Sequence, residues 1–124
     1  MKIRQGFVSN SSTSSFILTG IMVDPDDISG RILERLVHAF AVPAKDVETF
    51  HDLVYEIGLQ CEYNEYLREY YVGRVVAADG RDVVAVDPGT SFALGQTDQQ
   101  KLQMICDLLG IECDVKIYAG ANPD

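Results

Sequence analysis

A nearly continuous apolar run, SFILTGIMVD at residues 15–24, constrains the fold more than any other stretch of this chain. Between its ends only Thr19 and Gly20 interrupt the apolar side chains. Runs of this kind are typical of buried strands, whereas a strand with one solvated face alternates polar and apolar residues. We therefore expect a mostly buried strand here.

Helical periodicity follows in three segments, at residues 24–40, 44–58 and 97–110. The first opens with DPDD, whose acids and proline are favoured in a first helical turn. The third opens with Thr97 and Gln100 at the spacing of a capping box. The apolar positions expected to face a core are Ile28, Ile32, Leu36 and Phe40 in the first helix, Val47, Phe50, Val54 and Ile57 in the second, and Leu102, Ile105 and Leu109 in the third.

Further strands are expected after the second and third helices. The segment YYVGRVVA at 70–77 is rich in aromatic and β-branched residues and leads through the turn signal Asp79-Gly80 into DVVAVD at 82–87. These features predict a hairpin. The segment 111–118 alternates apolar and polar residues, which predicts a half-exposed strand.

The order of these elements is strand, helix, helix, strand, strand, helix, strand. It predicts an α+β fold, in which a small, mostly antiparallel sheet of about four strands carries helices packed on one face. The whole chain, 1–124, is expected to form one domain, because this length suffices for a core without disulfide or metal support.

The charge balance narrows the possible partners. The chain has 19 acidic and 10 basic residues, a net charge of −9. Such a chain repels nucleic acid phosphates and anionic lipid headgroups, so no direct nucleic-acid binding is expected. The charge suits a basic protein partner or a merely solubilising role. No apolar run reaches the roughly 18 residues of a membrane span, and the first residues lack a signal peptide's apolar region. We expect a cytoplasmic protein, although a location in a virion also fits.

The residues that most often perform catalysis form no recognisable motif. Cys61, Cys106 and Cys113 lack zinc or disulfide-framework spacing, which indicates reduced thiols. His38 and His51 belong to no metal-binding pattern, and no nucleotide-binding or hydrolase motif occurs. We therefore expect a non-enzymatic protein with no cofactor.

An enzymatic or metal-binding role remains an alternative, carried by loop carboxylates. It requires that Asp24, Asp79 and Asp87 converge, because hard cations bind several oxygen ligands and acid–base chemistry needs a carboxylate of perturbed pKa.

Tyrosines interleaved with acids form the most distinctive surface candidate. Tyrosine offers a large contact area with a polar tip and is enriched in interfaces. The expected partner-binding residues are Tyr63, Glu65, Tyr66, Glu69 and Tyr70. Their partner would be a basic host or phage protein, and inhibition of a host protein is one form of this role. The alternative is that some of these tyrosines face the core and the rest are ordinary surface residues.

A serine-rich segment, residues 9–15, lies between the apolar pairs Phe7-Val8 and Phe16-Ile17. The flanks predict that both ends are anchored in the fold, with Phe16 buried under the helices. The hydroxyl residues would then form a turn or edge segment whose side chains bond to the backbone. The alternative is a recognition or modification signal.

Residues 4–16, RQGFVSNSSTSSF, resemble the opening of a group of small proteins of uncharacterised function from tailed bacteriophages and bacteria. These proteins begin with R-x-G-F-V-S-N-S-S-[ST]-S-S-F, and a looser likeness continues into YYVGRVV and LLGIECDVKIYAG. The resemblance implies a phage-type origin, in an accessory protein or a minor virion component. It supplies no activity or site residue to transfer.

Overall fold

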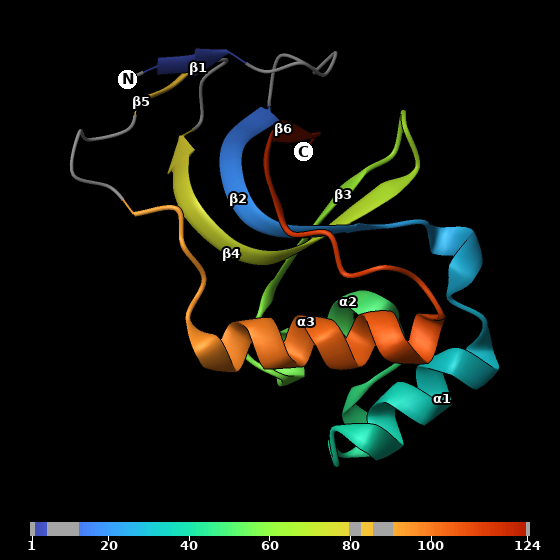
Figure 1. Cartoon of the computed structure of the whole chain (residues 1–124). Helices are drawn as coiled ribbons and strands as arrows, with labels where there is room; N and C mark the ends of the chain where they lie inside the picture. The colour runs from blue at the N-terminus through green and yellow to red at the C-terminus, as the bar shows by residue number, and fades with distance from the viewer. Residues whose placement is uncertain (1, 5–12, 80–82, 86–90, 124) are drawn as a thin grey trace.

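The computed structural model describes residues 2–4, 13–79, 83–85 and 91–123 (Figure 1). In chain order its elements are β1 (Lys2–Arg4), β2 (Thr13–Val23), the 3₁₀ turn η1 (Pro25–Asp27), α1 (Gly30–Ala39), the 3₁₀ turn η2 (Ala44–Asp46), α2 (Phe50–Glu56), β3 (Gln60–Asn64), β4 (Glu69–Asp79), β5 (Val83–Ala85), α3 (Gln96–Leu109) and β6 (Lys116–Pro123).

A four-stranded antiparallel sheet with the order β3-β4-β2-β6 organises the chain, and β1 pairs with β5 in a separate two-stranded sheet. All three helices lie beneath the larger sheet in Figure 1. The expected α+β class, with four strands and helices on one face, is confirmed.

One of the four strands is not the expected one. Residues 60–64 form β3, which pairs with β4, whereas residues 83–85 pair with β1. The hairpin expected at residues 70–87 is therefore wrong, and the turn that closes the actual hairpin lies between Asn64 and Glu69. The segment QCEYN mixes polar, acidic and aromatic residues, so its sequence shows no strand pattern. It forms a strand because it pairs with β4.

The helices begin later or earlier than their sequence signals indicate. The acids of DPDD form η1, and α1 starts at Gly30 because Ser29 Oγ accepts a hydrogen bond from the Ile32 amide at 3.1 Å. The second helix shrinks to Phe50–Glu56, capped by Thr49 and Asp52 in a reciprocal capping box.

The third helix begins at Gln96 with Gly95 as its N-cap and no side-chain cap, so the expected box of Thr97 and Gln100 is wrong. Gly110 ends this helix in the left-handed conformation, with φ of 72°, as expected.

The two faces of the sheet carry separate apolar clusters. Alternate residues of β2 point to opposite faces, so Ile21 and Val23 pack against the helices, whereas Phe16 and Leu18 lie on the other face. Phe16 is buried, with 4% of its surface exposed, but it contacts Tyr71 rather than lying under the helices as expected.

The serine-rich segment is described only from residue 13 onward. Thr13, Ser14 and Ser15 are part of β2 and pair with β6, and Ser15 also pairs with β4, so this portion lies inside the sheet rather than at a turn or edge. Residues 9–12 and the anchors Phe7 and Val8 lie outside the described residues.

The last strand also differs from its pattern. The chain is irregular from 111 to 115, and β6 starts at Lys116. Ile111 and Cys113 pack against the helix-side core from this irregular segment. Ile117 lies on an edge strand, and 53% of its surface is exposed.

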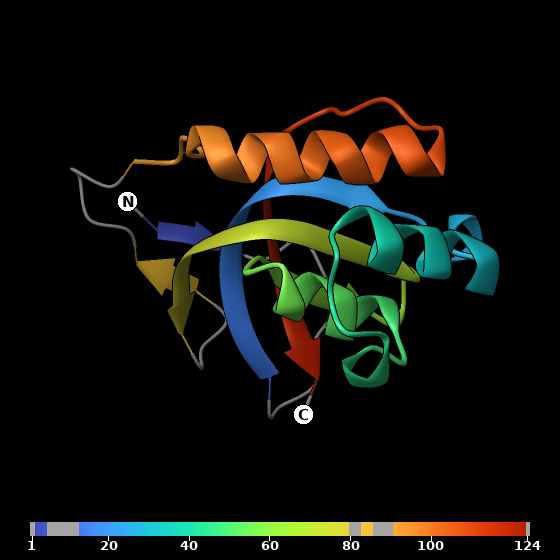
Figure 2. The ribbon, with the colours of Figure 1, turned by 90° about the horizontal axis from the view of Figure 1, so that it is seen from below.

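A pair of glycines joins β2 and β4, the two central strands of the sheet, and both strands bend strongly (Figure 2). Gly20 pairs with Gly73, and a Cβ at Gly20 would lie 1.9 Å from the Val72 carbonyl oxygen. Tyr71 of β4 reaches Tyr118 of β6 on the face away from the helices, with ring centroids 5.0 Å apart. The strand between them is β2, and Gly20 offers no side chain to block this contact. The glycine pair thus permits both the close strand approach and the aromatic cluster.

Candidate functional site

The β3–β4 hairpin holds all five residues that the sequence analysis selected for partner binding. At its base, Tyr63 and Tyr70 face each other across the two strands with ring centroids 4.9 Å apart. Tyr70 also contacts Phe50 of α2 edge-to-face at 5.3 Å. Both tyrosines are half-buried, so at this level of the hairpin the aromatic rings contribute to packing.

The tip of the hairpin presents different side chains to solvent. Tyr66 and Leu67 expose 56% and 53% of their surfaces, and Glu65 beside them is exposed. Asn64, buried at 2% exposure, accepts hydrogen bonds through Oδ1 from the amides of Tyr66 and Leu67, both at 2.9 Å. Arg68 completes the turn in the left-handed region, with φ of 54°. A buried side chain therefore fixes the backbone that displays the exposed aromatic residue.

Glu69 belongs to a third environment. It lies on the sheet face away from the helices and accepts a hydrogen bond from the Tyr71 hydroxyl at 2.5 Å. Burial and this hydrogen bond raise the pKa of Tyr71 far above its ordinary value. The selected residues are thus divided among the hairpin base, its tip and the opposite face.

Carboxylates from distant parts of the chain gather next to the hairpin. Tyr70 pairs with Val23, the last residue of β2, so η1 follows directly beside Glu69. Asp26 of η1 forms an ion pair with Arg68 at 3.6 Å. A hollow of about 340 Å³ here is lined by apolar residues, by Lys116 and by four acids, which are Asp24, Asp27, Glu112 and Asp114. We call the residues Asp24, Asp26, Asp27, Glu65, Glu69, Glu112 and Asp114 the acidic end.

Sequence reasoning missed the acidic end because its members come from separate segments. The close spacing of Asp24, Asp26 and Asp27 was visible, but Glu112 and Asp114 join them only through the pairing of β2 with β6. Lys116 neutralises part of this charge through its ion pair with Asp114 at 3.0 Å.

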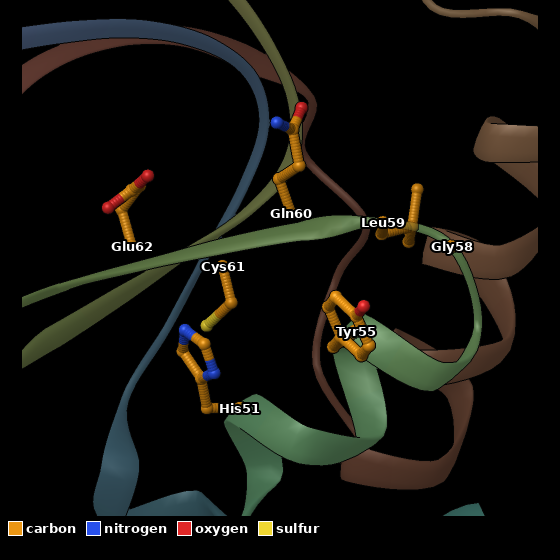
Figure 3. Close-up of a pocket in the computed structure, with 7 residues that line it drawn as sticks. All are labelled: His51, Tyr55, Gly58, Leu59, Gln60, Cys61 and Glu62. Carbon is orange, nitrogen blue, oxygen red and sulfur yellow. The ribbon is translucent and has the colours of Figure 1, made fainter.

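A second hollow, of about 390 Å³, lies at the base of β3 and contains the most reactive residue types of the hairpin. Figure 3 shows the His51 ring beside the Cys61 sulfur, on the α2 side of β3, with Glu62 on the other side of the strand. Burial raises the pKa of the Cys61 thiol to about 12, and burial also raises the pKa of Glu62. Cys61 is thus protonated at neutral pH, and the nucleophilic form of cysteine is the thiolate.

The convergence of loop carboxylates that the enzymatic or metal-binding alternative requires does not occur within the described residues. Asp24 follows Val23 at one end of β2, whereas Asp79 pairs with Ser15 at the other. At about 3.3 Å per residue the two lie roughly 30 Å apart along the strand. Asp87 lies outside the described residues, and among those described no three side chains of the metal-ligating types come together.

A search for membrane-spanning helices and three comparisons with known proteins complete the description. Within residues 2–4, 13–79, 83–85 and 91–123, no helix has the length and apolar character needed to cross a bilayer. Comparison of the chain with protein-family models, with curated proteins and with solved structures gave no match.

Proposed function

We propose that this chain is a non-enzymatic, phage-type accessory protein that binds a basic protein partner through the tip of the β3–β4 hairpin. The observation that carries the proposal is the exposed pair Tyr66 and Leu67, displayed by a backbone that Asn64 holds in place. Ordering a loop before binding lowers the entropic cost of association. Exposed aromatic residues on an ordered loop are therefore suited to a protein interface.

The charge around the tip supports a basic partner. The acidic end adjoins the hairpin at the ion pair between Arg68 and Asp26, and Lys116 forms a second ion pair, with Asp114. Complementary charge speeds association and disfavours acidic competitors such as nucleic acids. An interface that combines Tyr66 and Leu67 with these acids would accept arginine or lysine side chains around an apolar contact.

The state of the hairpin's cysteine favours binding over catalysis. His51 and Cys61 lie side by side, but the raised pKa of Cys61 keeps its thiol protonated. Catalytic cysteines show the opposite shift, toward a stable thiolate at neutral pH.

The test is site-specific photo-crosslinking from the tip. A benzoylphenylalanine replaces Tyr66 in one variant and Tyr55 in a control, because Tyr55 is also an exposed tyrosine, at 73%, but belongs to α2. In the natural host cells, the variant at position 66 is expected to form one dominant crosslinked product that the variant at position 55 does not form. Mass spectrometry then identifies the captured protein and its isoelectric point.

Charge reversal at two positions distinguishes a contribution of the hairpin tip to binding from an effect of the overall negative charge. Glu65→Lys is expected to lower the yield of this crosslink several-fold, whereas Glu34→Lys, at an exposed position of α1, leaves the yield unchanged. Identical products from positions 66 and 55, or an acidic captured protein, would overturn the proposal.

A further inference from the structure

We propose that Cys106 and Cys113 form an oxidative modification site, at which hydrogen peroxide or a small-molecule disulfide converts the two thiols into an intramolecular disulfide. The site is separate from the hairpin and does not depend on the proposed function. Three observations carry the proposal, namely the turn that brings the cysteines together, the contact between their side chains and the access to one of them.

The turn after α3 folds the chain back onto the last turn of the helix. Gly110 adopts the left-handed conformation, and the Ile111 amide donates a hydrogen bond to the Cys106 carbonyl oxygen at 3.0 Å. The segment that follows therefore runs back beside the helix that ends at Leu109. This reversal places Cys113 next to Cys106, although the two are seven positions apart in the sequence.

The two side chains interact directly within the core. Burial and the neighbouring Cys113 thiol raise the pKa of the Cys106 thiol, and both residues belong to the same apolar cluster. Both thiols are free in the structure. Since a disulfide requires the sulfur atoms to approach to about 2.05 Å, thiols that are neighbours in one cluster need little backbone movement to join.

Access differs between the two cysteines and sets the order of the reaction. Cys106 is fully buried, whereas Cys113 is partly exposed and borders a surface hollow of about 360 Å³ between α3 and the following segment. The sulfur of Cys113 attacks one oxygen of hydrogen peroxide, the O–O bond breaks, and a sulfenic acid and water form. The Cys106 thiol, whose pKa is raised to about 12, gives up its proton to the departing hydroxyl group as its sulfur attacks the sulfenic sulfur, so the S–O bond breaks and a second water leaves as the disulfide forms.

The disulfide would fasten the end of α3 to the segment that leads into β6. The disulfide closes a short loop that is already ordered in the folded protein. It therefore stabilises the protein mainly by lowering the conformational entropy of the unfolded chain. We expect the oxidised protein to show a Tm about 5 °C higher than the reduced protein. Hydrogen exchange of the amides at 111–115 is expected to slow on oxidation.

The experiment uses the full chain, treated with hydrogen peroxide or with oxidised glutathione and then denatured and alkylated. The expected product has lost two hydrogen masses, retains one alkylatable thiol of the three, and yields a peptide pair joined through Cys106 and Cys113. Cys61→Ser is the matched control, and it should still form the bond.

Cys113→Ser should abolish the intramolecular disulfide. Because Cys113 is only partly buried, this variant is expected to fold, so loss of the disulfide can be assigned to the missing thiol. The variant must first show an unchanged circular dichroism spectrum. Three alkylatable thiols after both treatments, a bond that includes Cys61, or only intermolecular disulfides would overturn the proposal.

Discussion

Tyr63 and Tyr70, at the base of the β3–β4 hairpin, are half-buried and contact each other, and Tyr70 also contacts Phe50, whereas Tyr66, at the tip, exposes 56% of its surface. The three tyrosines belong to one acidic, aromatic stretch of sequence. Their environments differ because strand register turns Tyr63 and Tyr70 toward α2, while Tyr66 lies in the turn that Asn64 holds. Position within the hairpin, rather than residue type, separates the half-buried tyrosines that pack against the fold from the exposed one.

The largest effect on stability is expected from adding a methyl group at Gly73, at the base of the β3–β4 hairpin. In Gly73→Ala the new Cβ would lie 2.1 Å from the Thr19 carbonyl oxygen, and because that atom belongs to the backbone of the adjacent strand, the strands must separate. We expect a loss of about 4 kcal/mol or more, enough to unfold the domain. Urea denaturation measures this. Gly30→Ala is the control, since nothing lies within 4 Å of its Cβ, and it should be neutral or slightly stabilising.

Truncation of a base tyrosine is expected to cost less. Tyr70→Ala removes a half-buried ring that contacts both Phe50 and Tyr63, so the free energy of unfolding should fall by about 2–3 kcal/mol. Tyr66→Ala should change it by less than about 0.5 kcal/mol, as is usual for surface sites. Equal losses in the two variants would show that base and tip are not distinct.

The link between base and tip is Asn64. Asn64→Ala leaves the amides of Tyr66 and Leu67 without their acceptor, which should cost about 1–2 kcal/mol. Hydrogen exchange provides the specific readout, since these two amides should exchange faster in the variant while the amides of β4 away from the turn do not. Unchanged exchange at both amides would argue against the role assigned to Asn64.

The smallest expected effect depends on pH and involves Glu62 at the base. Burial raises its pKa in the folded protein above the ordinary 4.5, so the fold disfavours the ionised carboxylate. Stability therefore falls as the pH rises from the unfolded pKa through the folded one. Glu62→Gln removes this loss, so the variant should be slightly more stable than the natural protein near about pH 7 and indistinguishable from it near about pH 3. A variant that is less stable at neutral pH would contradict this sign.

Much of the fold follows from local sequence patterns. The apolar run of β2, the αL glycine at 110 and the apolar faces of the helices predict the α+β class, because burial and backbone conformation at these positions are local properties. The strand β3 escaped prediction since QCEYN becomes a strand only through its pairing with β4. The signal Asp79-Gly80 suggested a hairpin partner that pairs instead with β1, a segment more than 70 residues away.

The site was less predictable than the fold. The tyrosine-rich stretch drew attention to the β3–β4 hairpin, but which tyrosines face α2 depends on strand register. The acidic end depends on the pairing of β2 with β4 and β6, which no single segment reveals. Charge composition predicted a basic partner but did not indicate where on the surface the acids would meet.

The central claim is that the tip binds the partner while the base maintains the fold, and one paired measurement tests it most directly. The variant Tyr66→Ser/Leu67→Ser and the control Tyr55→Ser are compared by urea denaturation and by calorimetric titration with the protein captured from position 66. We expect both to unfold at the midpoint of the natural protein, with affinity reduced at least about tenfold only in the tip variant, as loss of an interface hot spot requires. Undiminished affinity of a correctly folded tip variant would contradict the claim.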